Sequence, residues 1–124
     1  MLMRKAEVND SFITKILTGN NVLRAAIARI EWVFETFPSV CLSFSGGKDS
    51  TVLFHLVANV ARRKKRRFSV LFIDWEAQYQ CTVEHIQKMR NMYGDVTETF
   101  YWVALPLTTV NGVSQFQPEW ICWE

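Results

Sequence analysis

The feature that most restricts the fold of this chain is the segment 43–51, which reads Ser-Phe-Ser-Gly-Gly-Lys-Asp-Ser-Thr. The apolar residues 40–42 precede it, and apolar residues at helical spacing follow it. This order predicts a strand, a tight turn and a helix that begins at the turn. The first N–H groups of a helix have no partner within the helix and carry partial positive charge, so they favour an anion such as phosphate.

The composition of this segment suits the same ligand better than it suits an ordinary glycine-rich connection. Gly46 and Gly47 can adopt backbone angles closed to other residues and let an anion approach the main chain closely. Lys48 adds a mobile cation. The hydroxyl donors of the segment are Ser45, Ser50 and Thr51.

Asp49 is out of place in a site that binds only an anion. A carboxylate among phosphate ligands indicates a bridging Mg²⁺, which binds one or two carboxylates together with substrate phosphates. The Walker loop does not fit, because it requires Ser or Thr directly after its Lys, where this chain has Asp49. The dinucleotide pattern G-x-G-x-x-G is absent as well.

Strands and helices are predicted to alternate along the chain. The uninterrupted apolar run Phe68–Ile73 is typical of a strand covered on both faces of a parallel sheet. Strand, helix, strand, helix, strand implies right-handed crossovers and an α/β fold with a parallel sheet. One domain is expected over 22–124, after a lead-in of residues 1–21. The expected helices span about 22–37, 49–63 and 83–93, and the expected strands about 39–44, 68–73 and 97–105.

Two carboxylates follow the strand at 68–73. In a parallel sheet, ligands bind outside the carboxyl ends of the strands. Asp74 and Glu76 are therefore expected beside the same crevice as the glycine-rich segment, where they suit ribose hydroxyls, a metal ion or a cationic group. Both also suit capping of the next helix. Binding and capping are equal alternatives for Glu76, and binding is favoured for Asp74.

The residues Ser45 to Ser50 resemble, at all six positions, the pyrophosphate loop (PP-loop) of the N-type ATP pyrophosphatases. Asp-Trp-Glu-Ala-Gln-Tyr after the second strand is similar to the phosphoadenosine phosphosulfate (PAPS) reductase branch. The resemblance is closest to relatives that include the immunoglobulin-binding regulator and the DNA phosphorothioation proteins. It implies a three-layer, Rossmann-like α/β fold of the adenine nucleotide alpha hydrolase type, truncated here after three strands.

The resemblance also implies a ligand and a set of contacts. The ligand is ATP or PAPS with Mg²⁺, and the chemistry of a complete protein is attack on the α-phosphate with release of pyrophosphate. Asp49 is the expected metal ligand, and Asp74 and Glu76 lie beside the nucleotide. The phosphate-binding residues are Ser45, Gly46, Gly47, Lys48, Asp49 and Ser50, and the backbone that holds adenine is near Ser43, Phe44, Phe72 and Ile73.

The chain departs from the resemblance in ways that leave its catalytic residues unknown. The reductases carry a catalytic cysteine in Glu-Cys-Gly-Leu-His, and no segment here matches it; Cys122 is not assigned nucleophilic chemistry. The apolar end, with Trp120 and Trp123, predicts a missing C-terminal portion or partner protein, and association into oligomers. The alternative function is a non-catalytic nucleotide-sensing or nucleic-acid-associated regulator.

Six consecutive basic residues occupy 62–67, while elsewhere eight Lys and Arg face twelve Asp and Glu. A solvated helix end, where cations offset the helix dipole, is favoured over a nucleic-acid patch, because no aromatic residue interrupts the run. With 124 residues, no apolar run near the ~20 needed to cross a bilayer and no signal peptide, the chain is expected in the cytoplasm. Three widely spaced cysteines indicate neither disulfides nor zinc, and Cys41 and Cys81 are expected to be buried thiols.

Overall fold

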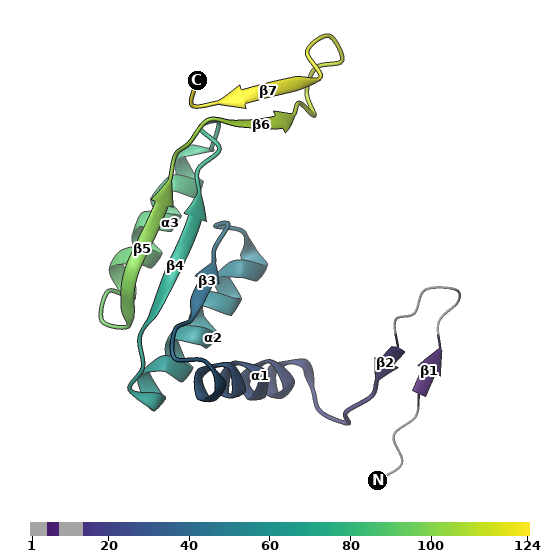
Figure 1. The fold of residues 1–124 in the computed structure, drawn as a ribbon, viewed down its shortest axis with the longest axis vertical. Helices are drawn as coiled ribbons and strands as arrows, with labels where there is room; N and C mark the ends of the chain where they lie inside the picture. Colours follow the sequence, from purple (N-terminus) through teal and green to yellow (C-terminus); the bar gives the residue numbers. More distant parts are fainter. Residues whose placement is uncertain (1–4, 8–13) are drawn as a thin grey trace.

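The computed structural model describes residues 5–7 and 14–124, and it has the expected α/β arrangement (Figure 1). Its centre is a parallel sheet with strand order β3-β4-β5. The connection from β3 to β4 contains α2, and that from β4 to β5 contains α3. The central elements are α1 (Val22–Thr36), β3 (Cys41–Ser43), α2 (Lys48–Lys64), β4 (Phe68–Ile73), α3 (Gln80–Met92) and β5 (Thr97–Val103).

The sheet buries one face. In Figure 1, α2 and α3 both lie behind the strands, because right-handed crossovers that advance in one direction along a sheet place their helices on the same side. Residues on this side, such as Leu42, Val70 and Phe72, form the core with Phe54 of α2. The other residues of β4 are only half-buried, and Ile73 is exposed. The prediction that this strand is covered on both faces is therefore wrong for the described residues.

The same asymmetry corrects the prediction for two cysteines. Cys41 lies on the uncovered side of β3, where burial alternates along the strand, and Cys81 lies in the first turn of α3; both are exposed. Cys122 is the buried thiol, at 0% exposure, and its Sγ lies 3.4 Å from the carbonyl oxygen of Leu107.

The basic run 62–67 lies at the C-terminal end of α2, and its side chains bind α1, the segment after α1 and β5. Lys65 closes the helix in the left-handed conformation, with φ of 53°. Arg63 and Lys64 pair with carboxylates of α1, at 3.0 Å from Glu31 and 2.5 Å from Glu35. Arg66 donates to backbone carbonyls after α1, and Arg67 donates to the Thr97 carbonyl of β5 at 2.8 Å. These contacts support the interpretation of the run as a helix end.

Arg62 makes the best-formed ion pair of the run. Its Nε and Nη2 donate to the two carboxylate oxygens of Asp95 at 2.8 and 2.7 Å. These hydrogen bonds hold the pKa of Asp95 below its usual value, and the same contact raises the pKa of Arg62. Because the carboxylate is favoured in the folded state, the pair stabilises the fold above the ordinary Asp pKa of about 3.9 and loses its effect as pH falls further.

We therefore expect Asp95→Asn to lower the melting temperature slightly at neutral pH and not at strongly acidic pH. The effect is small because the pair is exposed to solvent. Thermal unfolding of both proteins between about pH 2 and pH 7 measures it. A difference in melting temperature that persists unchanged at the acidic end would contradict this role of the pair.

Two antiparallel ribbons lie outside the predicted elements. β1 (Lys5–Glu7) pairs with β2 (Thr14–Ile16) within the predicted lead-in, part of which lies outside the described residues. β6 (Leu107–Val110) pairs with β7 (Glu119–Cys122), and in Figure 1 this hairpin crosses beyond the carboxyl ends of β4 and β5. Between 14 and 124, none of the helices combines the length and the apolar character needed to span a membrane.

Candidate functional site

The glycine-rich segment forms the turn between β3 and α2, as predicted. Gly46 has φ of +81°, a conformation that residues with a Cβ rarely adopt. A Cβ there would also lie 3.1 Å from Ile86 and 3.2 Å from Thr82, both on α3. Gly47 has an ordinary φ of −74°, so the expectation of unusual backbone angles holds for Gly46 alone. The turn is thus fixed by its own backbone and by the first half of α3.

Helix α2 begins directly at this turn with an open N-terminus. Gly47 is the N-cap, and within the described part of the chain no side chain caps it. The first helical hydrogen bond runs from Thr51 N–H to the Gly47 carbonyl at 2.9 Å. The N–H groups of residues 48–50 precede that bond and point out of the helix end, where they suit an anion.

Lys48 and Asp49 project from this end of α2. Their side chains are each 91% exposed, and Lys48 Nζ lies 3.0 Å from Asp49 Oδ1. Such an exposed pair stabilises the fold little, so both groups are available to a ligand at small cost.

The predicted Mg²⁺ requires oxygen ligands, and this site offers one carboxylate, that of Asp49. Between residues 14 and 124 no three His, Cys, Asp or Glu side chains gather as a metal site. The residues fit Mg²⁺ as an ion that binds one carboxylate and takes its other ligands from substrate phosphates and water. They do not form a site that the protein fills by itself.

The hydroxyl groups of the segment form a connected set. Ser45 Oγ and Ser50 Oγ lie 3.0 Å apart, and Ser50 Oγ lies 3.1 Å from the Gly47 carbonyl oxygen. Thr51 Oγ1 lies 2.7 Å from that carbonyl oxygen and 2.8 Å from Nε2 of His85 on α3. The sequence reasoning missed His85; the signal was its place next to Ile86 on a helix that follows the second predicted strand. The other histidine, His55, contacts the Tyr93 hydroxyl between α2 and α3.

Asp74 lies directly after β4 and is 8% exposed. Its Oδ1 accepts from the backbone N–H of Glu76 at 2.9 Å, and its Oδ2 accepts from Trp102 Nε1 at 2.8 Å. Its backbone carbonyl accepts from Trp123 Nε1 at 2.7 Å. Asp74 therefore joins three segments at the carboxyl end of the sheet. Direct contact between its carboxylate and a nucleotide stays a prediction.

Neither carboxylate caps the next helix, so that alternative is wrong. The N-cap of α3 is Tyr79, and no side chain of the described residues caps this helix. Glu76 has a left-handed φ of 64°, and its Oε2 accepts from the Trp123 N–H at 2.7 Å. The apolar chain end, predicted to pack on something absent, thus packs in part against the loop after β4.

The residues expected to hold adenine lie at the ends of β3 and β4. Phe44 and Phe72 are 2% and 1% exposed, so only their backbone can face a ligand. The Phe44 N–H already donates to the Leu71 carbonyl at 2.9 Å. Ser43 and Ile73 are exposed on the uncovered side of the sheet. The structure brings these four residues to the same edge as the glycine-rich turn.

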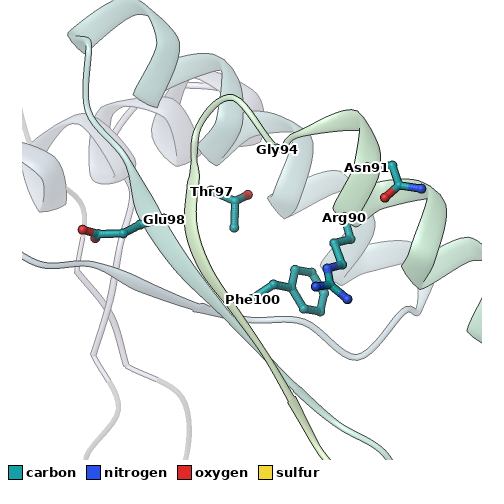
Figure 2. Close-up of a pocket in the computed structure, with 6 residues that line it drawn as sticks. All are labelled: Arg90, Asn91, Gly94, Thr97, Glu98 and Phe100. Atoms are coloured by element: carbon teal, nitrogen blue, oxygen red, sulfur yellow. The ribbon is translucent and has the colours of Figure 1, made fainter.

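Two pockets lie at opposite ends of the sheet. One, of about 470 Å³, lies at the carboxyl end between Trp75 and Ala77 of the loop after β4 and residues 109–113 and Trp120 of the β6–β7 hairpin. The other, of about 380 Å³, is shown in Figure 2 and lies where α3 ends and β5 begins, with Arg90 over the ring of Phe100. The second pocket contains no predicted nucleotide-binding residue, so it lies apart from the proposed chemistry.

Comparisons with known proteins identify the family of the chain. The profile of the phosphoadenosine phosphosulfate reductase domain matches residues 39–103, from just before β3 to the end of β5. The chain is 57% identical over 112 residues to "Uncharacterized protein YbdN" of Escherichia coli (strain K12). The aligned residues cover 90% of this chain and 28% of that protein. The chain thus spans about a quarter of the length of this relative. No solved structure matches. The profile covers both ends of the glycine-rich turn and the loop after β4, and the chain belongs to the phosphoadenosine phosphosulfate reductase domain family.

Proposed function

We propose that this chain is a PP-loop domain that binds an adenine nucleotide, ATP or PAPS, through the turn between β3 and α2. The observation that carries the proposal is the uncapped N-terminus of α2 at Gly47, next to the exposed Lys48. Backbone N–H groups, the Lys48 ammonium and the hydroxyls of Ser45 and Ser50 would bind the phosphates. The backbone near Ser43, Phe44, Phe72 and Ile73 would face adenine.

In a longer protein that contains this domain, the proposed chemistry is attack of an acceptor on the α-phosphorus with loss of pyrophosphate. The donors of the turn would stabilise the negative charge that develops on the leaving pyrophosphate. Bound Mg²⁺, held by Asp49 and phosphate oxygens, would neutralise part of the same charge. Cys122 is buried with its thiol directed at backbone carbonyls, which gives no support to a role as nucleophile.

The structure does not favour the nucleic-acid-associated form of the regulatory alternative. Five of the six basic residues that would meet a nucleic acid are engaged within the chain: Arg62, Arg63 and Lys64 with carboxylates, and Arg66 and Arg67 with backbone carbonyls. A nucleotide sensor without catalysis uses the same turn. Release of pyrophosphate from ATP by the longer protein, across candidate acceptors, distinguishes the sensor from the enzyme.

We expect Lys48→Ala to weaken nucleotide binding by about 1.5–3 kcal/mol, the scale of a lost hydrogen bond to a charged group. Isothermal titration with ATP, PAPS and inorganic pyrophosphate, each with Mg²⁺, measures the loss. Lys88→Ala is the matched control, because Lys88 is an exposed lysine on α3 outside the turn. Equal affinity of the wild-type protein and Lys48→Ala would exclude Lys48 from the phosphate site.

A further inference from the structure

The carbonyl oxygen of Gly47 has more donors than it can accept at full strength. Thr51 N–H lies 2.9 Å from it, Thr51 Oγ1 lies 2.7 Å from it, and Ser50 Oγ lies 3.1 Å from it. A carbonyl oxygen has two lone pairs. The Thr51 N–H holds one of them as the first bond of α2, so the hydroxyl protons of Ser50 and Thr51 compete for the other.

His85 decides this competition, because its Nε2 lies 2.8 Å from the same Thr51 hydroxyl. A hydroxyl group has one proton to donate, and one nitrogen of a neutral imidazole donates while the other accepts. If Nε2 carries the proton, it donates to Thr51, and Thr51 donates to the Gly47 carbonyl. If Nε2 carries no proton, the Thr51 hydroxyl donates to Nε2 of His85, and the Ser50 hydroxyl donates to the Gly47 carbonyl.

The two arrangements differ in how the Ser50 hydroxyl is oriented toward an anion bound at the turn. In the first, the Ser50 hydroxyl proton is released from the carbonyl and can point to a phosphate oxygen. In the second, that proton is held inside the turn, and Ser50 turns a lone pair toward the anion. An anion therefore favours the first arrangement, with the proton on Nε2 of His85.

We propose that His85 is a positioning residue for the phosphate turn, which acts through Thr51 to set whether the Ser50 hydroxyl donates to the ligand. The proposal rests on the proposed function, since Ser50 is one of the expected phosphate ligands. The place of His85 is fixed by packing: its ring lies 6.2 Å from that of Phe44, and its neighbour Ile86 packs against Gly46. No contact with the ligand is required of the imidazole itself.

Variants at the two ends of the His85–Thr51 contact are expected to act in opposite directions. Thr51→Val leaves the Gly47 carbonyl to Ser50 and should weaken binding of inorganic pyrophosphate by about threefold to tenfold, the scale of one neutral hydrogen bond. His85→Leu leaves Thr51 only the Gly47 carbonyl and should bind pyrophosphate as tightly as the wild-type protein, or more tightly. Loss of a purely structural contact would weaken both variants, and that result would overturn the proposal.

Two further measurements separate the possible causes. In a Ser50→Ala background, Thr51→Val should cause no additional loss of affinity, because the competing hydroxyl is gone; an additive loss would overturn the proposal. His55→Leu removes the other histidine contact between α2 and α3 and should leave binding unchanged. Thermal unfolding of each variant, without ligand, shows whether a loss of affinity comes from a loss of fold.

The imidazole can also be observed directly. The chain has two histidines, so ¹⁵N spectra of the wild-type protein and of His55→Leu assign the signals of His85. Pyrophosphate should shift the His85 tautomer toward the proton on Nε2. If the wild-type protein binds pyrophosphate and this tautomer does not change, the role of His85 fails and the proposed function stands. If the wild-type protein does not bind pyrophosphate, the proposed function fails and the inference falls with it.

Discussion

Asp74→Ala is expected to lower the free energy of unfolding by about 3 kcal/mol or more, because it removes two hydrogen bonds to a charged group, each worth about 1.5–3 kcal/mol. The variant leaves the Trp102 indole N–H and the Glu76 N–H without the carboxylate oxygens that they contact at 2.8 and 2.9 Å. Both donors lie at the carboxyl end of the sheet beside a residue that is 8% exposed. Urea unfolding followed by circular dichroism measures the loss.

Asp74→Asn is the matched control, since it keeps one acceptor oxygen and nearly the same volume. It should retain one of the two hydrogen bonds and lie between the wild-type protein and Asp74→Ala in stability. If Asp74→Ala is as stable as the wild-type protein to within about 0.5 kcal/mol, as for an ordinary surface substitution, the carboxylate does not hold this loop.

Gly46→Val should combine a loss of stability with a loss of ligand binding. A β-branched residue at φ of +81° costs about 1–3 kcal/mol in backbone strain, and a misfitting side chain in a packed site costs a similar amount. The added atoms would meet Ile86 and Thr82 at 3.1 and 3.2 Å. Relief of the clash moves the turn away from α3, so the N–H groups at the start of α2 lose their arrangement around the phosphates.

The comparison with Gly47→Ala shows whether the conformation of the turn is the cause. Gly47 has φ of −74°, and among the described residues a Cβ there would meet only Ser45 Oγ, at 3.5 Å. Gly47→Ala should keep the stability of the wild-type protein, whereas Gly46→Val should lose both stability and pyrophosphate affinity. Denaturant unfolding and isothermal titration of both variants measure the two effects. Equal behaviour of the two variants would contradict the special role of Gly46.

Periodicity predicted the three helices and β4 well, because these elements are long enough to carry a repeated pattern. The strand Phe68–Ile73 has the predicted bounds, and α1 begins at the predicted Val22. The hairpin of β6 and β7 was not predicted, since its strands have four residues each and residues 111–118 separate them. The wrong prediction of a strand covered on both faces came from composition, which cannot show that both crossover helices lie on one side.

In the candidate site, too, contiguous residues were predicted from the sequence and contacts between distant residues were not. The residues of the turn, Ser45 to Ser50, are contiguous, so the sequence alone placed them at the start of a helix, and the structure has α2 begin at Lys48. His85 and Trp123 lie 34 and 47 residues from the groups that they contact, Thr51 and Glu76, and no local pattern marks such pairs. The contacts of Asp74 were missed for the same reason, because Trp102 and Trp123 reach it from distant segments.

The sequence by itself determined the α/β class, the order of the central elements and the glycine-rich turn at the start of a helix, because each follows from residues that are neighbours along the chain. Only the tertiary structure decided which cysteine is buried, which carboxylate holds the loop after β4, and which histidine faces the turn. Those properties depend on packing between α2, α3 and the sheet, and packing brings together residues whose separation along the chain carries no signal.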